Sequence, residues 1–187
     1  MGIGDKRLQK NHWKEPSSRK SFPLIGDMTK YIHYGSDRFD PDLFISVRNG
    51  SWLPKPAEHT GLWASRVDDE YGWAAWCRAN QFNISSLEQS FCFTLPAARI
   101  LTISAPEDLI PLPKLHPWEP RGASFMLTSF EPGKMYTPQW CYLDFEKLAN
   151  DYDAIELINS AELYFCLHTW DCNSILVMRK EAITPLV

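Results

Sequence analysis

The sequence predicts one folded domain of the α+β class, and three observations support this prediction. The chain has 187 residues, 44% of them apolar, which is enough for one medium-sized core. Its strand-like segments are short, and helix-like segments do not alternate with them regularly, which disfavours a doubly wound parallel sheet. No internal repeat is visible. We therefore expect a single domain over residues 30–187, preceded by a basic, flexible extension over residues 1–29.

The first elements of this domain are two strands and a helix. Strands are expected at 31–34 and 61–65, where β-branched and aromatic residues adjoin a glycine. A loop rich in Gly and Pro separates the two strands. Asp68 and Asp69 are expected to cap a helix that ends near Asn80.

The middle of the chain predicts two more strands and a long loop. The strands are expected at 90–95 and 99–104, joined around a proline. Ser104 and Glu107 have the spacing of a capping box at the start of a short helix. Residues 113–138 are rich in Pro and Gly without periodicity, and a loop of that length inside a domain is usually functional or mobile.

The C-terminal part alternates between helix and strand. Residues 143–150 are amphipathic and predict a helix, and 153–158 predict a strand. Residues 160–167 are ambiguous between the two. The apolar segment 174–179 predicts the last strand.

Charge and cysteine content exclude several classes of protein. A net charge of −4 gives no overall electrostatic signature of nucleic-acid or membrane binding. No apolar run reaches the roughly twenty residues of a membrane helix, and no signal peptide is visible. The cysteines are scattered without C-x-x-C spacing, which indicates a reducing compartment and neither a disulfide framework nor a metal site. The five cysteines are Cys77, Cys92, Cys141, Cys166 and Cys172. We therefore expect a cytoplasmic protein.

Basic residues are concentrated at the N-terminus, whereas the rest of the chain is acidic. A solvated terminus explains this best, and contact with RNA, an anionic surface or an acidic partner is the alternative. The basic residues are Lys6, Arg7, Lys10, Lys14, Arg19 and Lys20, against Asp5 and Glu15.

Three short motifs carry the functional information. The first, YIHYGS at 31–36, and the second, GLWAS at 61–65, each place a histidine or an aromatic residue before small residues. The third is YDAIEL at 152–157, which is followed by a further strand-like segment, WDCNSILVM at 170–178, and by Ile183. Together these segments resemble the nucleotide-binding and C-terminal strands of ADP-ribosyltransferases.

The resemblance implies a fold and an activity. The fold of that family has split mixed or antiparallel sheets with short flanking helices. Its members are transferases, more narrowly glycosyltransferases, that use NAD as a substrate: they cleave the bond between nicotinamide and ribose and transfer ADP-ribose to an acceptor, or to water. Here the acceptor, a protein or a nucleic acid, cannot be read from the sequence.

The resemblance also assigns roles to residues at the reacting bond. Glu156 would be the catalytic carboxylate, stabilising the positive charge that develops on the ribose. His33 would donate a hydrogen bond to a ribose hydroxyl, and Ser65 would support Glu156. Asp153 and Asp171 are weaker alternatives, because each adjoins an expected strand end where ordinary turn chemistry explains an aspartate.

The remaining residues of the expected NAD site would bind the dinucleotide. Gly35 would let backbone approach it closely, with Tyr34 and Ser36 beside it. Trp63 and Tyr71 would stack on the cationic nicotinamide ring. For His33 and Trp63 the alternative roles are a hydrogen-bonded histidine within a sheet and a core indole.

The sequence also departs from the family. A Glu-x-Glu pair is missing, because Ala154 and Ile158 stand two positions on either side of Glu156. This leaves two alternatives to a transferase: a non-catalytic protein-binding module of the same fold, and an NAD-using enzyme similar to RNA 2′-phosphotransferases. No P-loop, GxGxxG turn, HExxH helix or nucleophile elbow is present.

Overall fold

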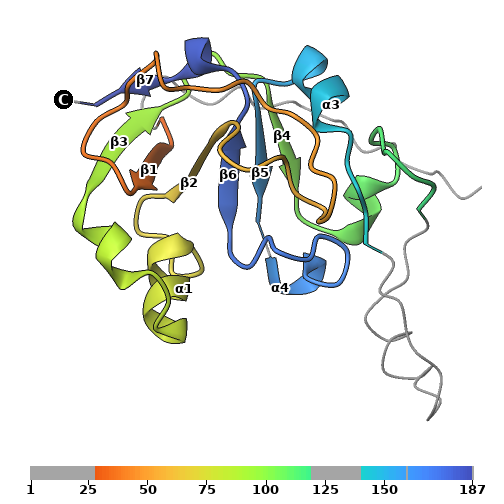
Figure 1. The fold of residues 1–187 in the computed structure, drawn as a ribbon, viewed down its shortest axis with the longest axis horizontal. Coiled ribbons are helices and arrows are strands. Elements are labelled where there is room, and N and C mark those ends of the chain that lie inside the picture. The colour runs from red at the N-terminus through yellow and green to blue at the C-terminus, as the bar shows by residue number, and fades with distance from the viewer. Residues whose placement is uncertain (1–27, 119–139, 159, 187) are drawn as a thin grey trace, which may run out of the picture.

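A computed structural model of the chain describes residues 28–118, 140–158 and 160–186. Short strands and short helices follow one another irregularly along these residues (Figure 1). In chain order the elements are β1 (Lys30–Tyr34), β2 (Leu62–Arg66), α1 (Trp73–Asn80), η1 (Ile84–Glu88), β3 (Ser90–Thr94), β4 (Ile100–Ile103), η2 (Pro106–Leu109), α3 (Phe145–Asp151), β5 (Ala154–Leu157), α4 (Ser160–Leu163), β6 (Ser174–Val177), η3 (Lys180–Ala182) and β7 (Thr184–Pro185), where η marks a 3₁₀ helix.

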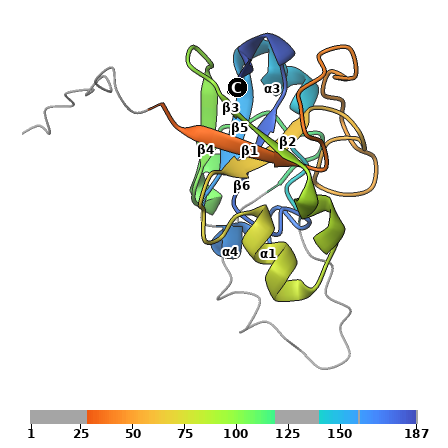
Figure 2. The same ribbon diagram turned by 90° about the vertical axis from the view of Figure 1, so that its left-hand side faces the viewer.

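The strands of the described residues form one curled sheet in the order β4-β5-β6-β2-β1-β3-β7. The pair β4 and β5 is parallel, and the other neighbouring pairs are antiparallel. Figure 1 shows α1 and α4 at one end of the sheet and α3 towards the other, and Figure 2 shows the sheet side-on with β1 crossing the view. Because the helices gather at the ends of a mixed sheet, the predicted α+β class is confirmed.

The two strands that carry the first motifs are neighbours for only a short distance. β1 and β2 pair at Tyr31 with Arg66 and at Ile32 with Ser65. At the next residue of β1 the contact is made by a side chain, since His33 Nδ1 lies 2.7 Å from the carbonyl oxygen of Trp63. β1 instead pairs with β3 along its whole length. A histidine ring thus spans the place where the two motif strands separate.

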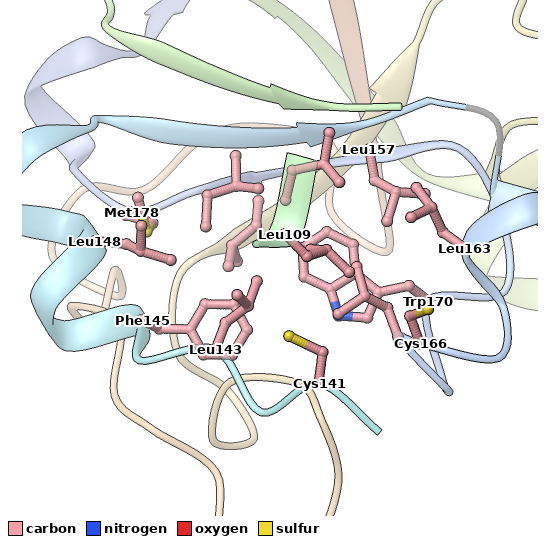
Figure 3. Close-up of a cluster of buried hydrophobic side chains, with 14 of the residues drawn as sticks. Leu109, Cys141, Leu143, Phe145, Leu148, Leu157, Leu163, Cys166, Trp170 and Met178 are labelled. Atoms are coloured by element: carbon pink, nitrogen blue, oxygen red, sulfur yellow. The ribbon is translucent and has the colours of Figure 1, made fainter. Parts of the chain in front are cut away.

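The sheet has an apolar cluster on each face. The larger one packs α3 and Trp170 against Ile155 and Leu157 of β5, and Figure 3 shows its side chains. Ala154 belongs to the second cluster, which includes residues of β1, β2, β3 and β6. Because side chains alternate along a strand, Glu156 shares the face of Ala154. All four residues of β5 are buried.

The observed elements correct two predicted helix starts. The helix expected from Asp68 begins only at Trp73, because Asp68 has a φ of 62° and Asp69 Oδ1 accepts a hydrogen bond from the Tyr71 amide in a turn. At the 3₁₀ helix η2 the capping carboxylate is Asp108, not Glu107. Asp108 Oδ2 accepts hydrogen bonds from the amide and the hydroxyl of Ser104 and from the amide of Ala105.

The remaining elements agree with the prediction to within a few residues. β2 is shifted by one residue from the expected 61–65, and β6 ends two residues before the expected 179. The ambiguous segment 160–167 begins as the short helix α4. The extension expected at 1–29 and the loop expected at 113–138 lie mostly outside the described residues.

Candidate functional site

A cavity of about 980 Å³ opens where β1 and β2 separate, a volume near the upper end for small-molecule sites. Its lining comes from five parts of the chain: the end of β1, the loop 55–59, the middle of β2, the helix α1 with residues 82–86, and the segment 169–174. Elements far apart in the sequence therefore meet around one hollow.

Four of the residues predicted for NAD binding line this cavity. His33, Tyr34 and Gly35 reach it from β1 and the turn that follows. Trp63 reaches it from β2. Gly35 has a φ of 105°, a conformation that L side chains rarely adopt, and a Cβ there would meet nothing within 4 Å. Residues of the first two motifs thus line one cavity.

Two other predicted residues lie elsewhere. Ser36 is in the turn after β1, where its hydroxyl donates a hydrogen bond to the Arg38 carbonyl at 2.7 Å. Tyr71 is 66% exposed and lines a smaller hollow of about 380 Å³ between α1 and α4. Trp76 and Asp171 border both hollows.

Ser65 does not line the cavity, although its neighbour Ala64 does. Its hydroxyl accepts a hydrogen bond from the Trp73 amide at 2.9 Å and donates one to the Asn173 carbonyl at 3.1 Å. Gly72 precedes the first residue of α1 and has no side chain that could cap the helix. Ser65 of β2 instead supplies the oxygen that accepts the first helical amide, that of Trp73. The expectation that Ser65 supports Glu156 is wrong.

Glu156 does not line the cavity. Arg66 binds its carboxylate with two hydrogen bonds, Nε to Oε1 at 2.7 Å and Nη2 to Oε2 at 2.8 Å. The Tyr31 hydroxyl donates a third to Oε1 at 3.3 Å. Glu156 is 5% exposed, and burial raises the pKa of Tyr31, with the nearby Glu156 charge as a second cause. The structure thus places this carboxylate outside the cavity lining, against Tyr31 and Arg66.

His33 has a defined protonation pattern. Burial lowers the pKa of its ring, and the hydrogen bond to the Trp63 carbonyl only partly opposes this shift. The ring is therefore neutral at pH 7. A carbonyl can only accept, so the proton is on Nδ1 and Nε2 keeps its lone pair. The predicted role of His33 was that of a donor, whereas its Nε2 is an acceptor in this tautomer.

An aromatic cluster of three residues forms another wall. Trp73 and Trp76 of α1 stack with ring centroids 5.4 Å apart and planes 15° apart. Phe82 meets both rings edge-on, at 6.1 and 5.5 Å. Such rings can hold a flat, cationic heterocycle by stacking and cation–π attraction. Trp73 and Trp76 lie on the helix that the sequence predicted, whereas no sequence signal placed Phe82 beside them.

Trp63 combines the two roles that the sequence left open. Its indole meets Trp170 edge-on at 4.6 Å and packs against the larger apolar cluster, yet it also lines the cavity. Trp170 is 2% exposed, and its Nε1 donates to the Pro54 carbonyl at 3.1 Å. The wall at this point is therefore rigidly supported.

Unusual backbone conformations gather at the cavity. His59, Asn83 and Thr169 line it, with φ values of 61°, 44° and 82°. Asparagine tolerates such values, whereas a β-branched threonine does so at a cost of about 1–3 kcal/mol. Strain of this kind is characteristic of functional sites.

Two carboxylates border the cavity, those of Glu58 and Asp171. In the described parts of the chain, no three His, Cys, Asp or Glu side chains are grouped so that they could hold a metal ion. No helix among the described residues is long and apolar enough to cross a membrane.

Comparison with protein-family models, with curated proteins and with solved structures gives no match to this chain.

Proposed function

We propose that this protein binds NAD in the cavity between the diverging strands β1 and β2. The observation that supports it best is that His33, Gly35 and Trp63, from two motifs thirty positions apart, line the same hollow. The proposal includes an ADP-ribosyltransferase-like fold, because a mixed sheet whose β1 and β2 pair at two positions and then separate is similar to the split sheets of that family.

The cavity offers a group for each part of the dinucleotide. The indoles of Trp73 and Trp76 provide faces for a flat ring. His33 Nε2 can accept a hydrogen bond from a ribose hydroxyl, and the turn at Gly35 leaves room for close approach. Lys55 lines the cavity and supplies a cation for the diphosphate.

Binding is better supported than chemistry at Glu156. A carboxylate that stabilises an oxocarbenium ion has to face the ribose, whereas both oxygens of Glu156 are held by Arg66. We therefore propose NAD binding without catalysis as the primary function. The alternative stated from the sequence was different, a non-catalytic module of the same fold that binds a partner protein.

A second candidate function is ADP-ribosyl transfer or NAD hydrolysis. It is favoured by Asp171, because this alternative carboxylate borders the cavity. Measurement of free nicotinamide from the purified protein with NAD separates the two candidates. Under the binding proposal none is released. Release that persists in Glu156→Gln and is lost in Asp171→Asn would favour the transferase.

The binding proposal is tested by titrating NAD into the full chain and into His33→Asn. Asparagine keeps an N–H that can reach the Trp63 carbonyl but has no counterpart to Nε2. Loss of one neutral hydrogen bond predicts an affinity about three- to tenfold weaker. The control is Ser36→Ala, which should bind like the wild type because Ser36 does not line the cavity. Absence of any binding at millimolar NAD would refute the proposal.

A further inference from the structure

Thr169 combines two unfavourable features at one position. Its φ of 82° is in the left-handed region, which a β-branched side chain avoids. Its Oγ1 is buried and has no hydrogen-bond partner among the described residues. Proteins rarely leave a buried hydroxyl unpaired, because its lost hydration is then not replaced.

The neighbouring residue fixes this conformation. Trp170 is held by its indole bond to Pro54, by the Trp63 ring and by its amide, which donates to the Leu167 carbonyl at 3.0 Å. A strained residue persists when its surroundings determine its conformation in this way.

Thr94 provides an internal comparison. Its Oγ1 is likewise buried and unpartnered among the described residues. However, Thr94 is in the regular strand β3, paired with Thr184, and does not line the cavity. Thr169 thus combines an unpaired hydroxyl with backbone strain and lines the cavity. Thr94 has an unpaired hydroxyl without such strain and lies away from the cavity.

We infer that the Thr169 hydroxyl is a specificity-determining contact, which pairs with an amide or hydroxyl group of the ligand bound in the cavity. This inference rests on the proposed function. Because Oγ1 is covered, the ligand reaches it when the Thr169 side chain rotates about χ1 towards the cavity, while Trp170 keeps the backbone in place. The ligand then supplies the partner that the protein does not.

The inference is tested by comparing the stability and the NAD affinity of the wild type, Thr169→Val and Thr94→Val. Valine keeps the shape and the branching of threonine and removes only the hydroxyl. We expect Thr169→Val to be at least as stable as the wild type in urea, because an unpaired buried hydroxyl is removed, and to bind NAD about three- to tenfold more weakly. Thr94→Val should change stability in the same direction and bind NAD like the wild type.

Two further variants keep the test decisive. Thr169→Gly also lacks the hydroxyl but accepts a positive φ without strain, so it should fold even if the valine variant does not, and should show the same loss of affinity. Thr169→Ser keeps the hydroxyl and should keep the affinity. Parallel titrations with nicotinamide mononucleotide and with AMP, the two halves of NAD, should show the loss only for the half that carries the contacting group.

The outcomes separate this inference from the proposed function. If the wild type binds NAD and the valine and glycine variants bind it equally well, the inference is wrong and the proposed function stands. If the wild type binds no NAD at millimolar concentration, both are wrong.

Discussion

At the scale of single residues, His33 links the fold to the site, since its ring joins β1 to the Trp63 carbonyl and also lines the cavity. Its pKa is lowered by burial, so stability should depend on pH in a defined direction. Below about pH 6.5 the histidine of the unfolded chain takes up a proton before the buried ring does. The free energy of unfolding should therefore fall as the pH drops from 6.5 through the lower pKa of the folded state, and level off below it.

Urea unfolding at pH 7.5 and at pH 5.5 checks this prediction. In His33→Asn the decrease between the two values should be smaller than in the wild type, because the variant has no ring to protonate. Equal decreases in both proteins would show that His33 does not contribute to acid sensitivity.

Glu156 gives a second prediction at this scale. Glu156→Gln removes one partner of a largely buried ion pair, which generally costs about 3–5 kcal/mol when both partners are buried. The Arg66 side chain is 46% exposed, so water compensates part of the loss, and we expect destabilisation of about 1–2 kcal/mol with unchanged NAD affinity. The exposed Glu88→Gln is the control for urea unfolding. A Glu156→Gln variant of normal stability that no longer binds NAD would contradict the structural role.

The sequence identified single residues where the signal was local. The motif around His33 and Gly35 and the aromatic at Trp63 could be read directly, and they line the cavity. The position of Glu156 could not, because its partner Arg66 is ninety residues away in the sequence and on another strand. Strand alternation placed Glu156 on a face but did not say which cation lies opposite.

At the scale of elements, Ser65 connects β2, the start of α1 and the segment before β6. Ser65→Ala should cost about 1–2 kcal/mol, because it removes a helix cap and leaves a carbonyl without its donor. Urea unfolding measures the loss, and hydrogen exchange at the Trp73 amide should become faster. Ser36→Ala should stay within about 0.5 kcal/mol of the wild type. Equal stability of the two variants would show that Ser65 does not organise α1.

Helix starts were the least predictable feature of the elements. Acidic residues at 68 and 69 looked like caps, yet the chain turns there and the cap comes from Ser65 on another strand. Gly61 was expected to begin the second strand, which starts one residue later at Leu62. In the structure its φ is 68°, and a Cβ there would lie 2.6 Å from Leu176 Cδ1, so the glycine also allows β6 to approach closely.

At the scale of the whole molecule, the class of fold followed from the short, irregularly alternating segments, whereas the strand order did not. Pairings such as β2 with β6 join residues more than a hundred positions apart, and periodicity does not encode them. The shape of the cavity depends on these long-range pairings, so the sequence could suggest its members but not its volume or its aromatic wall.

The expected N-terminal extension gives a prediction at this scale. A chain that begins at Met28 keeps every strand and helix described here, so its Tm should lie within a few degrees of that of the full chain. Thermal unfolding followed by circular dichroism measures both. A large drop in the Tm of the shortened chain would show that residues 1–27 pack on the domain.

Occupation of the cavity by NAD is measured most directly by a titration that follows the indole N–H signals of the ¹⁵N-labelled protein. The signals of the cavity-lining tryptophans should shift, whereas that of Trp52, which is 85% exposed and lies outside the cavity lining, should not. The cavity-lining tryptophans are Trp63, Trp73, Trp76 and Trp170. Unchanged signals from all four at millimolar NAD, or shifts confined to Trp52, would contradict the account.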